Sequence, residues 1–337
     1  MSLSVPILPA EKYKVDQIEL SQPQECMLRS VSNVIGWCRQ VYKELVKDTK
    51  DHLSYRKWMK VVSRYYIDIL NTDRSNLHEF DSIYKDLVYQ TATKLSRNVE
   101  DVIIVFKAAR AADYPLLNLK DLLNAVPLDI STALIKRGGM EEYISLLLRY
   151  HVLSLTEGLF LSMDPDLYNC LKKSSGLPIL ECYASPFNHN LEANCSLFNE
   201  DRVFGCYTRF DKFIDAVNYA CRLCANPPFT PRAVAQCISK IINYMNTYNG
   251  EFVALLPVYH NYPPLEKILY YEHTQHTMLA PGTCTLHSFF TNTDIVTPMP
   301  LYLLVNVGGS KKASRRFLEE LQERLKMKAD SLCTTEA

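Results

Sequence analysis

The stretch Cys221-Arg-Leu-Cys-Ala-Asn226-Pro-Pro-Phe229-Thr-Pro231 decides the fold, because a rigid corner here joins a short apolar run to an amphipathic helix. Residues 221–225 have the character of a buried strand. After Pro231, which suits a first helical turn, apolar residues recur at helical spacing: Ala233, Val234, Cys237, Ile238, Ile241, Ile242 and Met245. Strand, loop and helix in this order form the unit whose carboxyl-end crevice binds ligands in open α/β sheets.

The corner Asn226-Pro227-Pro228-Phe229 offers two fixed hydrogen-bond acceptors and an aromatic face. Each proline fixes its own φ and restricts the preceding residue, so the corner keeps its shape before any ligand binds. The Asn226 side-chain oxygen and the Pro227 carbonyl suit the two hydrogens of a planar amino group such as adenine N6, and a base stacks on Phe229. An ordinary turn is the alternative, since Asn-Pro and Pro-Pro are common in turns.

The composition is that of a globular chain with one large domain or two ordinary ones: 337 residues, 47% hydrophobic and 22% charged. Lys plus Arg equals Asp plus Glu at 37 each, so any contact with nucleic acid must be local. No apolar run reaches membrane-spanning length, and residues 1–6 lack the pattern of a signal peptide. Eleven cysteines, an odd number, predict reduced thiols in an intracellular protein, with nucleus and cytoplasm both open.

The character of the chain changes near residue 165, which predicts a helical domain over 1–164 and an α/β domain over 165–337. Helical periodicity covers residues 27–46, 55–70, 77–95, 99–112 and 131–152. Short apolar runs then alternate with helical stretches, at 177–182, 203–206, 221–225, 252–257, 276–280, 286–290 and 301–307. This alternation predicts a mostly parallel sheet with helices on both faces.

Other candidate residues have weaker patterns. Cys221 and Cys224 form a C-x-x-C without a second ligand pair at zinc spacing, so we interpret them as small core residues and expect no metal site. His273 and His276 also lack metal-ligating partners nearby. The helix over 310–329 carries four basic residues that either contact phosphates or form a solvated face: Lys311, Lys312, Arg315 and Arg316.

The loop after the first predicted strand of the α/β region occupies the position where nucleotide-type cofactors bind in such sheets. It reads Glu181-Cys-Tyr-Ala184-Ser185-Pro186-Phe-Asn188. It does not match G-x-G-x-x-G, but the small residues Ala184 and Ser185 allow a ligand to approach closely. A plain strand-to-helix turn is the alternative.

These two runs together resemble the phosphorylated-CTD-interacting-factor family of cap-specific adenosine N6-methyltransferases. The resemblance covers residues 145–310 and includes five further runs: Leu147-Leu-Arg-Tyr150, Asn194-Cys-Ser-Leu-Phe198, Phe204-Gly205, Phe252-Val-Ala-Leu-Leu-Pro257 and His276-Thr-Met-Leu-Ala-Pro281. It implies a Rossmann-like class I methyltransferase domain preceded by an all-helical domain. It also implies transfer of a methyl group from S-adenosylmethionine to N6 of the first transcribed adenosine beside an RNA cap.

The resemblance also assigns site residues. Asn226, Pro227, Pro228 and Phe229 match the catalytic tetrad. Cofactor contacts are expected from Glu181, Ala184, Ser185, Pro186, Asn226, Thr283, Cys284 and Thr285, and substrate contacts from Phe229, Tyr259, His260 and Asn261. Tyr259 stands where the family has a tryptophan, and Thr230 and Pro231 replace polar and acidic residues. The expected partner is capped or single-stranded RNA, with no membrane, and protein partners stay open.

Two other classes of function remain. N-P-P-aromatic motifs also serve DNA adenine methyltransferases and protein-glutamine methyltransferases, although the neutral net charge disfavours DNA. A catalytically weak or inactive accessory subunit is the second class. The intact tetrad argues against an inactive subunit, and the departure from the family pattern at Thr283 to Thr285 argues for it.

Overall fold

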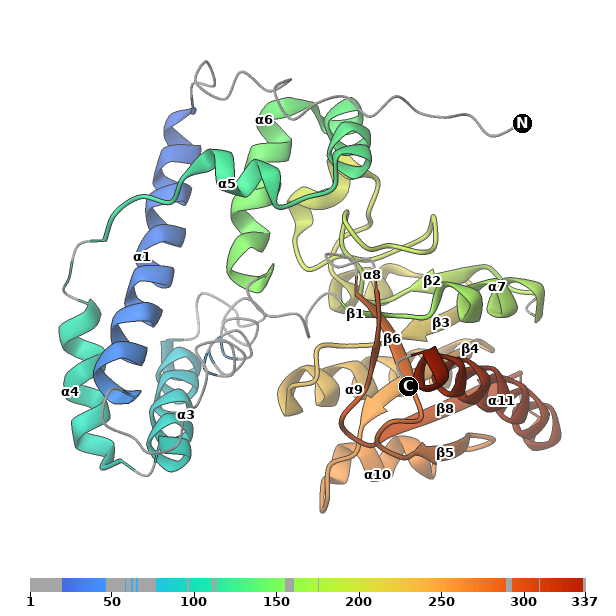
Figure 1. Cartoon of the computed structure of the whole chain (residues 1–337). Coiled ribbons are helices and arrows are strands. Elements are labelled where there is room, and N and C mark those ends of the chain that lie inside the picture. The colour runs from blue at the N-terminus through green and yellow to red at the C-terminus, as the bar shows by residue number, and fades with distance from the viewer. Residues whose placement is uncertain are drawn as a thin grey trace. The chain divides into compact units, whose positions relative to one another are not determined.

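The computed structural model describes residues 20–46, 58, 62, 65, 77–95, 97–110, 112, 114–154, 161–174, 176–288, 293–308 and 310–335. The chain divides into two compact units, one of residues 1–63 and 84–156 and the other of residues 64–83 and 157–337. Helices come first along the chain, and strands with helices follow (Figure 1). The predicted order, a helical region before a mixed region, is confirmed.

The helices of the amino-terminal region are α1 (Gln22–Val46), α3 (Leu77–Leu95), α4 (Val99–Arg110), α5 (Leu119–Asn124) and α6 (Leu128–Ser154). Phe106 on α4 is the centre of an aromatic core, with ring centroids 5.0 Å from Trp37 and 6.3 Å from Trp58. Gly139 interrupts α6 with a φ of +87°, a conformation that glycine adopts without strain. Of the predicted helix over 55–70, only residues 58, 62 and 65 are described, and all three are helical.

The main sheet has five strands in the order β2 (Ile179–Glu181), β3 (Arg222–Ala225), β4 (Glu251–Pro257), β8 (Leu301–Val307), β5 (Gln275–Leu279). Neighbouring strands from β2 to β4 are parallel, and β8 is antiparallel to both β4 and β5. Four strands therefore point the same way, and their carboxyl ends share one edge of the sheet. The prediction of a mostly parallel sheet is confirmed, with β8 as the exception.

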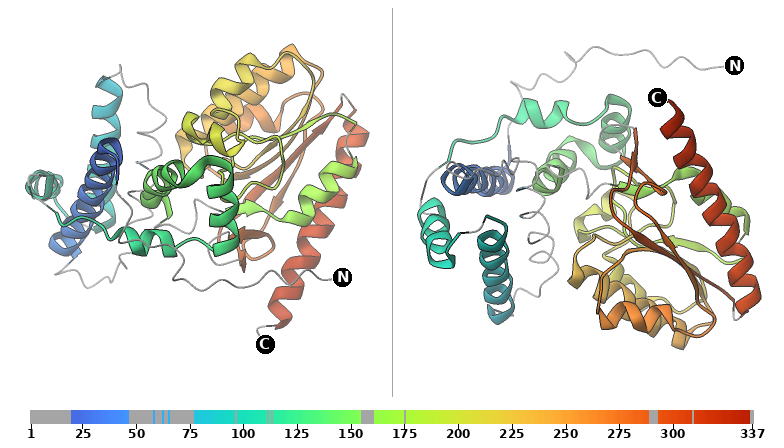
Figure 2. Two further views of the ribbon diagram at one scale, coloured as in Figure 1. Left: turned by 90° about the horizontal axis from the view of Figure 1, so that it is seen from above. Right: turned by 60° about the horizontal axis from the view of Figure 1, so that its bottom comes forward.

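Helices cover both faces of this sheet (Figure 2). Along β4, Phe252, Ala254 and Leu256 face one core, and Val253 and Leu255 face the other. The first core is closed by α8 (Phe210–Ala216), α9 (Pro231–Thr247) and α10 (Pro263–Leu269). The second core is closed by α7 (Pro165–Ser174) and α11 (Lys311–Thr335). Because β4 is buried on both faces, its sequence is a continuous apolar run rather than an alternating one.

A second, antiparallel sheet was not expected from the sequence. It has the order β1 (Leu161–Met163), β6 (Thr285–Ser288), β7 (Thr293–Val296). The predicted strand over 203–206 is wrong, because residues Asn199–Phe204 form a 3₁₀ helix. Gly205 ends that helix with a φ of +92°, which an extended strand does not allow. No helix among the described residues is both long and apolar enough to cross a bilayer.

Candidate active site at the carboxyl edge of the main sheet

Asn226 follows β3 at the interior of the main sheet, between the carboxyl ends of β2 and β4. Its side-chain N–H donates to the Leu161 carbonyl on β1 at 2.9 Å, which fixes the orientation of the amide. Its side-chain oxygen is buried and has no hydrogen-bond partner among the described residues. Burying an acceptor without a partner costs free energy, so this oxygen is a ready binding point for a donor.

The corner after Asn226 is held by the start of α9. The Thr230 N–H donates to the Pro228 carbonyl at 2.8 Å, and the Thr230 hydroxyl accepts from the Ala233 N–H at 3.2 Å as the N-cap of the helix. Pro231 follows in the first helical position, where a missing N–H is harmless. Thr230 and Pro231 are thus helix-starting residues, and the hydrogen bond of this turn uses the Pro228 carbonyl and not that of Pro227.

Two tyrosines from the loop after β4 support the corner from outside. The Tyr259 hydroxyl donates to the Phe229 carbonyl at 2.9 Å, and the Tyr262 hydroxyl donates to the Pro231 carbonyl. The two rings pack edge to face with centroids 5.3 Å apart. The Phe229 ring is half-buried against the core beneath α7 and α11. The Tyr259 hydroxyl therefore contacts the proposed tetrad directly, at the backbone carbonyl of Phe229.

His260 and Asn261 lie in the same loop but at the surface. Both side chains are exposed, and Asn261 has a φ of +52°, in the left-handed region. Asparagine tolerates this conformation better than most residues. The structure thus separates the three predicted substrate residues of this loop: Tyr259 supports the corner, while His260 and Asn261 line the exposed turn before α10.

Glu181 ends β2, and its carboxylate is occupied by three donors from the protein itself. It accepts from the Tyr168 hydroxyl at 2.8 Å and from the N–H groups of Asn190 and Leu191 at 2.8 and 3.0 Å. Burial raises the pKa of the Glu181 carboxyl above its ordinary value, although these donors oppose the shift. The side chain therefore ties the loop after β2 to α7.

A Glu181→Gln variant is expected to lack part of the pH dependence of stability. Because the folded-state pKa is raised above the ordinary value of 4.5, the contribution of Glu181 is fully present below pH 4.5 and is lost as the pH rises through the folded pKa. The variant should therefore gain stability relative to the wild type as the pH rises from 4.5 through the raised folded-state pKa. Denaturant unfolding at several pH values measures this difference, and a constant difference would contradict the assignment.

The loop beyond Glu181 is a compact, prefolded turn. The Ala184 N–H donates to the Cys195 carbonyl at 2.9 Å, and the Phe187 N–H donates to the Ser185 hydroxyl at 3.2 Å. The Ser185 hydroxyl in turn donates to the Asn188 side-chain oxygen at 2.8 Å. Ala184, Ser185 and Pro186 are all buried. The turn thus presents small residues and backbone at the carboxyl end of β2.

The predicted segment Thr283 to Thr285 leads into β6 in the second sheet. The Cys284 carbonyl accepts from the N–H and hydroxyl of Thr297, at 2.9 and 3.1 Å. The Thr285 hydroxyl is fully buried and has no hydrogen-bond partner among the described residues. Burial raises the pKa of the Cys284 thiol to about 12, with a smaller effect from Asp164. This thiol is therefore no nucleophile at neutral pH.

Strand β1 connects these two regions, and the sequence did not reveal it. Its Leu161 carbonyl orients Asn226, and its Met163 pairs with Leu286, the residue after Thr285. The buried oxygens of Asn226 and Thr285 thus belong to elements attached to the same short strand. β1 has only three residues, and so short a run shows no alternation of apolar and polar residues that would predict a strand.

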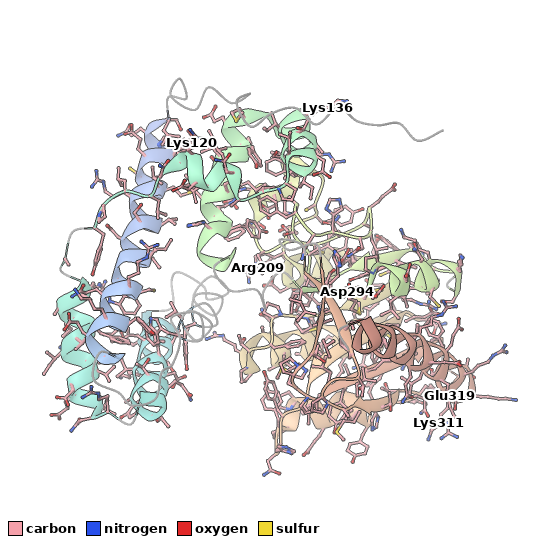
Figure 3. The ribbon with its side chains drawn as sticks, in the orientation of Figure 1. Lys120, Lys136, Arg209, Asp294, Lys311 and Glu319 are labelled. Carbon is pink, nitrogen blue, oxygen red and sulfur yellow. The ribbon has the colours of Figure 1, made fainter. Side chains whose placement is uncertain are left out.

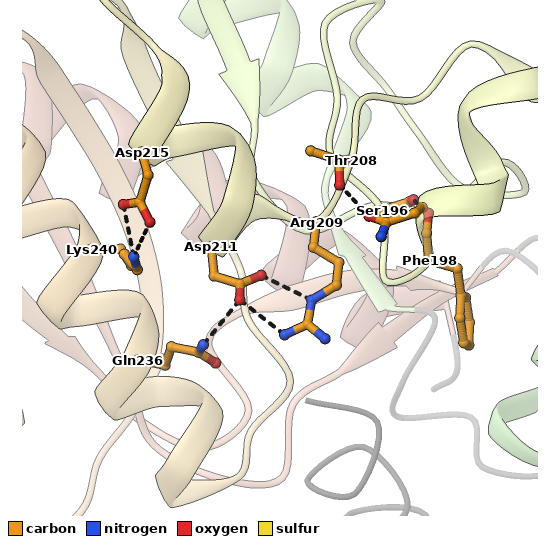
Figure 4. Close-up of polar contacts among 9 residues, drawn as sticks. Ser196, Phe198, Thr208, Arg209, Asp211, Asp215, Gln236 and Lys240 are labelled. Carbon is orange, nitrogen blue, oxygen red and sulfur yellow. Dashed lines mark hydrogen bonds and ion pairs between the residues drawn. The ribbon is translucent and has the colours of Figure 1, made fainter. Parts of the chain in front are cut away.

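Polar contacts between α8 and α9 hold the helix that follows the corner (Figure 4). Asp211 on α8 pairs with Arg209 at 2.9 Å and accepts from the Gln236 side chain on α9 at 3.4 Å. Asp215 pairs with Lys240 at 2.6 Å on the same two helices. These contacts fix α9, which begins at Pro231, two positions after the corner ends at Phe229.

Most of the described cysteine side chains are buried and pack in the hydrophobic core. The ten cysteines whose side chains the structure describes are free thiols, and Cys221 and Cys224 are buried at β3. Burial raises the pKa of both thiols, which disfavours the thiolate that a metal requires. Within the described ranges, no group of three or more His, Cys, Asp and Glu side chains is placed to hold a metal ion.

Residues 139–289 match the family model described as Phosphorylated CTD interacting factor 1 WW domain. This match supports a relation to the phosphorylated-CTD-interacting-factor family. It begins within α6 and ends directly after β6, so it includes the corner, the loop after Glu181 and the segment before β6. No curated protein matches the chain.

Proposed function

We propose that this protein transfers a methyl group from S-adenosylmethionine to N6 of adenosine in RNA, with the cap-adjacent first transcribed adenosine as its preferred target. The observation that carries the proposal is the buried Asn226 oxygen, which is oriented by Leu161 and has no partner among the described residues. The relation to the phosphorylated-CTD-interacting-factor family supports the RNA cap as the context.

The main sheet supports a Rossmann-like class I methyltransferase fold. Strands β2, β3 and β4 are parallel, and β8 enters antiparallel between β4 and β5. Beyond β2, parallel bridges join Glu181 to Asn194 and Cys195 to Tyr207, so backbone pairing continues past the edge strand. The loop after β2 and the corner after β3 therefore lie at one edge, where open α/β sheets bind nucleotide-type ligands.

The residues present fit a nucleotide-type cofactor. Ala184, Ser185 and Pro186 would bound it with small side chains at the end of β2, and the unpartnered Thr285 hydroxyl supplies a buried polar group. Glu181 would act indirectly, since its carboxylate already holds the loop. Bound S-adenosylmethionine supplies an electrophilic methyl carbon on a cationic sulfur.

The corner would orient the amino group that receives the methyl. The Asn226 oxygen accepts one N–H, and the Pro227 carbonyl accepts the other, which draws the nitrogen lone pair out of conjugation with the ring. The ring stacks on Phe229, whose carbonyl is held by Tyr259. Holding the reacting groups in place supplies much of the rate enhancement in such a transfer. A base must leave its stack to enter, which suits a single strand or a 5′ end.

The direct test is mass spectrometry of nucleosides, or of peptides for the protein substrate, after incubation with labelled S-adenosylmethionine and one of four substrates. These are capped adenosine-start RNA, the same RNA without a cap, single-stranded DNA, and protein. We expect N6-methylated adenosine from capped RNA. Methylation confined to DNA or to protein glutamine would contradict the RNA assignment and favour the other N-P-P-aromatic classes.

A non-catalytic binding subunit is the second candidate, and the satisfied polar groups of the loop after β2 favour it. The side chains of Glu181 and Ser185 both form hydrogen bonds with other residues of the protein rather than facing a ligand unpaired. Calorimetry with S-adenosylmethionine separates the two candidates. Heat of binding at one site supports the enzyme, and no binding at millimolar cofactor supports the accessory subunit.

A Tyr259→Phe variant is expected to slow methyl transfer several-fold while leaving cofactor affinity unchanged. The ring stays, but the Phe229 carbonyl loses its hydrogen bond, which is typically worth about 1 kcal/mol. Steady-state kinetics should show the loss in kcat, because the corner is less well held. The matched control is Tyr271→Phe, which removes the hydroxyl that bonds Asn246, outside the corner. Equal losses in both variants would contradict a positioning role for Tyr259.

A further inference from the structure

A cavity of about 420 Å³ lies at the opposite edge of the main sheet from Asn226. Its walls are the loop after α10, the first residues of β5 and the first two turns of α11. Gln275 at the start of β5 pairs with Val305 near the end of β8, which places the cavity at the amino ends of the parallel strands. The proposed active site does not use any residue of this wall.

The cavity wall carries two cations from one face of α11. Lys311 and Arg315 are four residues apart, and both line the cavity and are exposed. Lys311 projects from the start of the helix (Figure 3). Within the described part of the chain, neither side chain forms an ion pair with a carboxylate. Like charges at this spacing repel, and cations near a helix start oppose its dipole, so a bound anion would relieve both effects.

An exposed aromatic ring lines the same cavity as these cations. Tyr270 has 84% of its surface exposed, the highest value among the large apolar side chains that the structure describes. His276 also lines the wall, and burial lowers the pKa of its imidazole, so it is a neutral hydrogen-bonding group at pH 7. Glu272 is the one acid of the wall, and its carboxylate lies 3.2 Å from the His273 ring.

We propose that this cavity binds one nucleotide of single-stranded RNA, with its phosphate on Lys311 and Arg315 and its base against Tyr270. Basic side chains next to an exposed aromatic face are the combination with which proteins hold single strands. The polymer is identified as RNA by the proposed function, and the inference rests on it to that extent. The neutral net charge of the chain agrees with a small local contact rather than a broad basic surface.

The position of the cavity predicts that RNA length matters. β4 has seven residues, which separates the two edges of the sheet by roughly 20 Å. A cap dinucleotide held at the corner cannot reach the cavity, whereas an RNA of twenty nucleotides can. The cavity should therefore raise the affinity for longer RNA without changing the chemistry at Asn226.

Two double variants on one helix test the site. Lys311→Ala/Arg315→Ala removes the cavity cations, and Lys312→Ala/Arg316→Ala removes the same charge from exposed positions outside the wall. Fluorescence anisotropy with a labelled twenty-nucleotide single-stranded RNA, without cofactor, measures the dissociation constant over a salt series. We expect the first variant to bind about tenfold more weakly and its salt slope to fall by about 0.7, since the cavity holds one phosphate and each phosphate neutralised on a single strand contributes roughly 0.7. The control should stay within about twofold of the wild type.

Tyr270→Ala tests the stacking separately and should weaken RNA binding about tenfold at unchanged salt slope. None of these exposed positions supports the core, so thermal unfolding of every variant should match the wild type. An equal loss of RNA affinity in both double variants, or an unchanged RNA affinity in Tyr270→Ala, would overturn the proposed site. Competition by inorganic pyrophosphate as strong as by RNA would show a plain phosphate site instead. Because the assay needs no catalysis, absence of methylation would contradict the proposed function alone.

Discussion

Replacing Asn226 with alanine should lower methyl transfer by about 10² to 10³-fold, the usual effect of removing one hydrogen-bonding group aimed at the reacting centre. The variant loses the one buried acceptor at the corner that has no partner among the described residues. Affinity for S-adenosylmethionine should change little, because the loop after β2 and Thr285 are untouched. Single-turnover kinetics with capped RNA and calorimetry with cofactor measure the two effects separately.

Two further variants make this result specific. Asn226→Asp keeps an acceptor oxygen but loses the N–H that donates to Leu161, so it should retain more activity than alanine. Gln24→Ala removes a buried side-chain amide that donates to the Glu141 carbonyl at 2.8 Å, a comparable structural bond in the helical region. It should cost stability without a comparable loss of turnover. Normal turnover in Asn226→Ala would refute the role of the Asn226 oxygen.

Replacing Arg222 with alanine should destabilise the fold by about 3–5 kcal/mol, because it leaves a partner charge without its cation in a mostly buried site. Arg222 is 2% exposed and pairs with Glu251 at 2.6 Å. Its guanidinium also donates to the Leu171 carbonyl at 3.2 Å and to the Ser174 hydroxyl at 2.7 Å, and it lies 4.9 Å from the centre of the Phe317 ring. One side chain thus joins β3, β4, α7 and α11.

Urea unfolding of three proteins measures this effect: the wild type, Arg222→Ala, and the double variant Arg222→Met/Glu251→Met. The double variant removes both charges and fills the space, so it should recover much of the lost stability. Arg222→Lys should not rescue, since a single ammonium cannot reproduce the forked contacts of the guanidinium. A loss below about 1 kcal/mol in Arg222→Ala would place this ion pair among weak surface pairs.

The sequence was most informative where local pattern and packing agree. The helix over 77–95 and the strands over 252–257 and 301–307 were predicted at or near their observed bounds, because long apolar runs or clear periodicity mark them. β1 and β7 were missed, since three or four residues carry no period. The failed strand over 203–206 shows the same limit, because the glycine that ends the 3₁₀ helix is itself part of the apolar run.

The candidate site was predicted in its backbone position but not in its hydrogen bonds. The strand, corner and helix around Asn226 follow from residues 221–245 alone. The Glu181 carboxylate accepts a hydrogen bond from Asn190, nine positions along the chain, and the Tyr259 hydroxyl donates to the Phe229 carbonyl, thirty positions away. Such pairings are set by the tertiary fold, and no local pattern encodes them.

The place of β8 in the sheet has a consequence for synthesis. β5 precedes β8 along the chain but joins the sheet only through it, and β4 pairs with β8 on the side away from β3. While the ribosome is still adding residues before 301, the largely apolar strand β4 therefore keeps one edge unpaired, and β5 has no neighbouring strand to pair with. Open edges of this kind invite pairing with other chains. Stalled or truncated products that stop before residue 301 should consequently be clients of chaperones and prone to aggregate, even though the complete corner has already been translated.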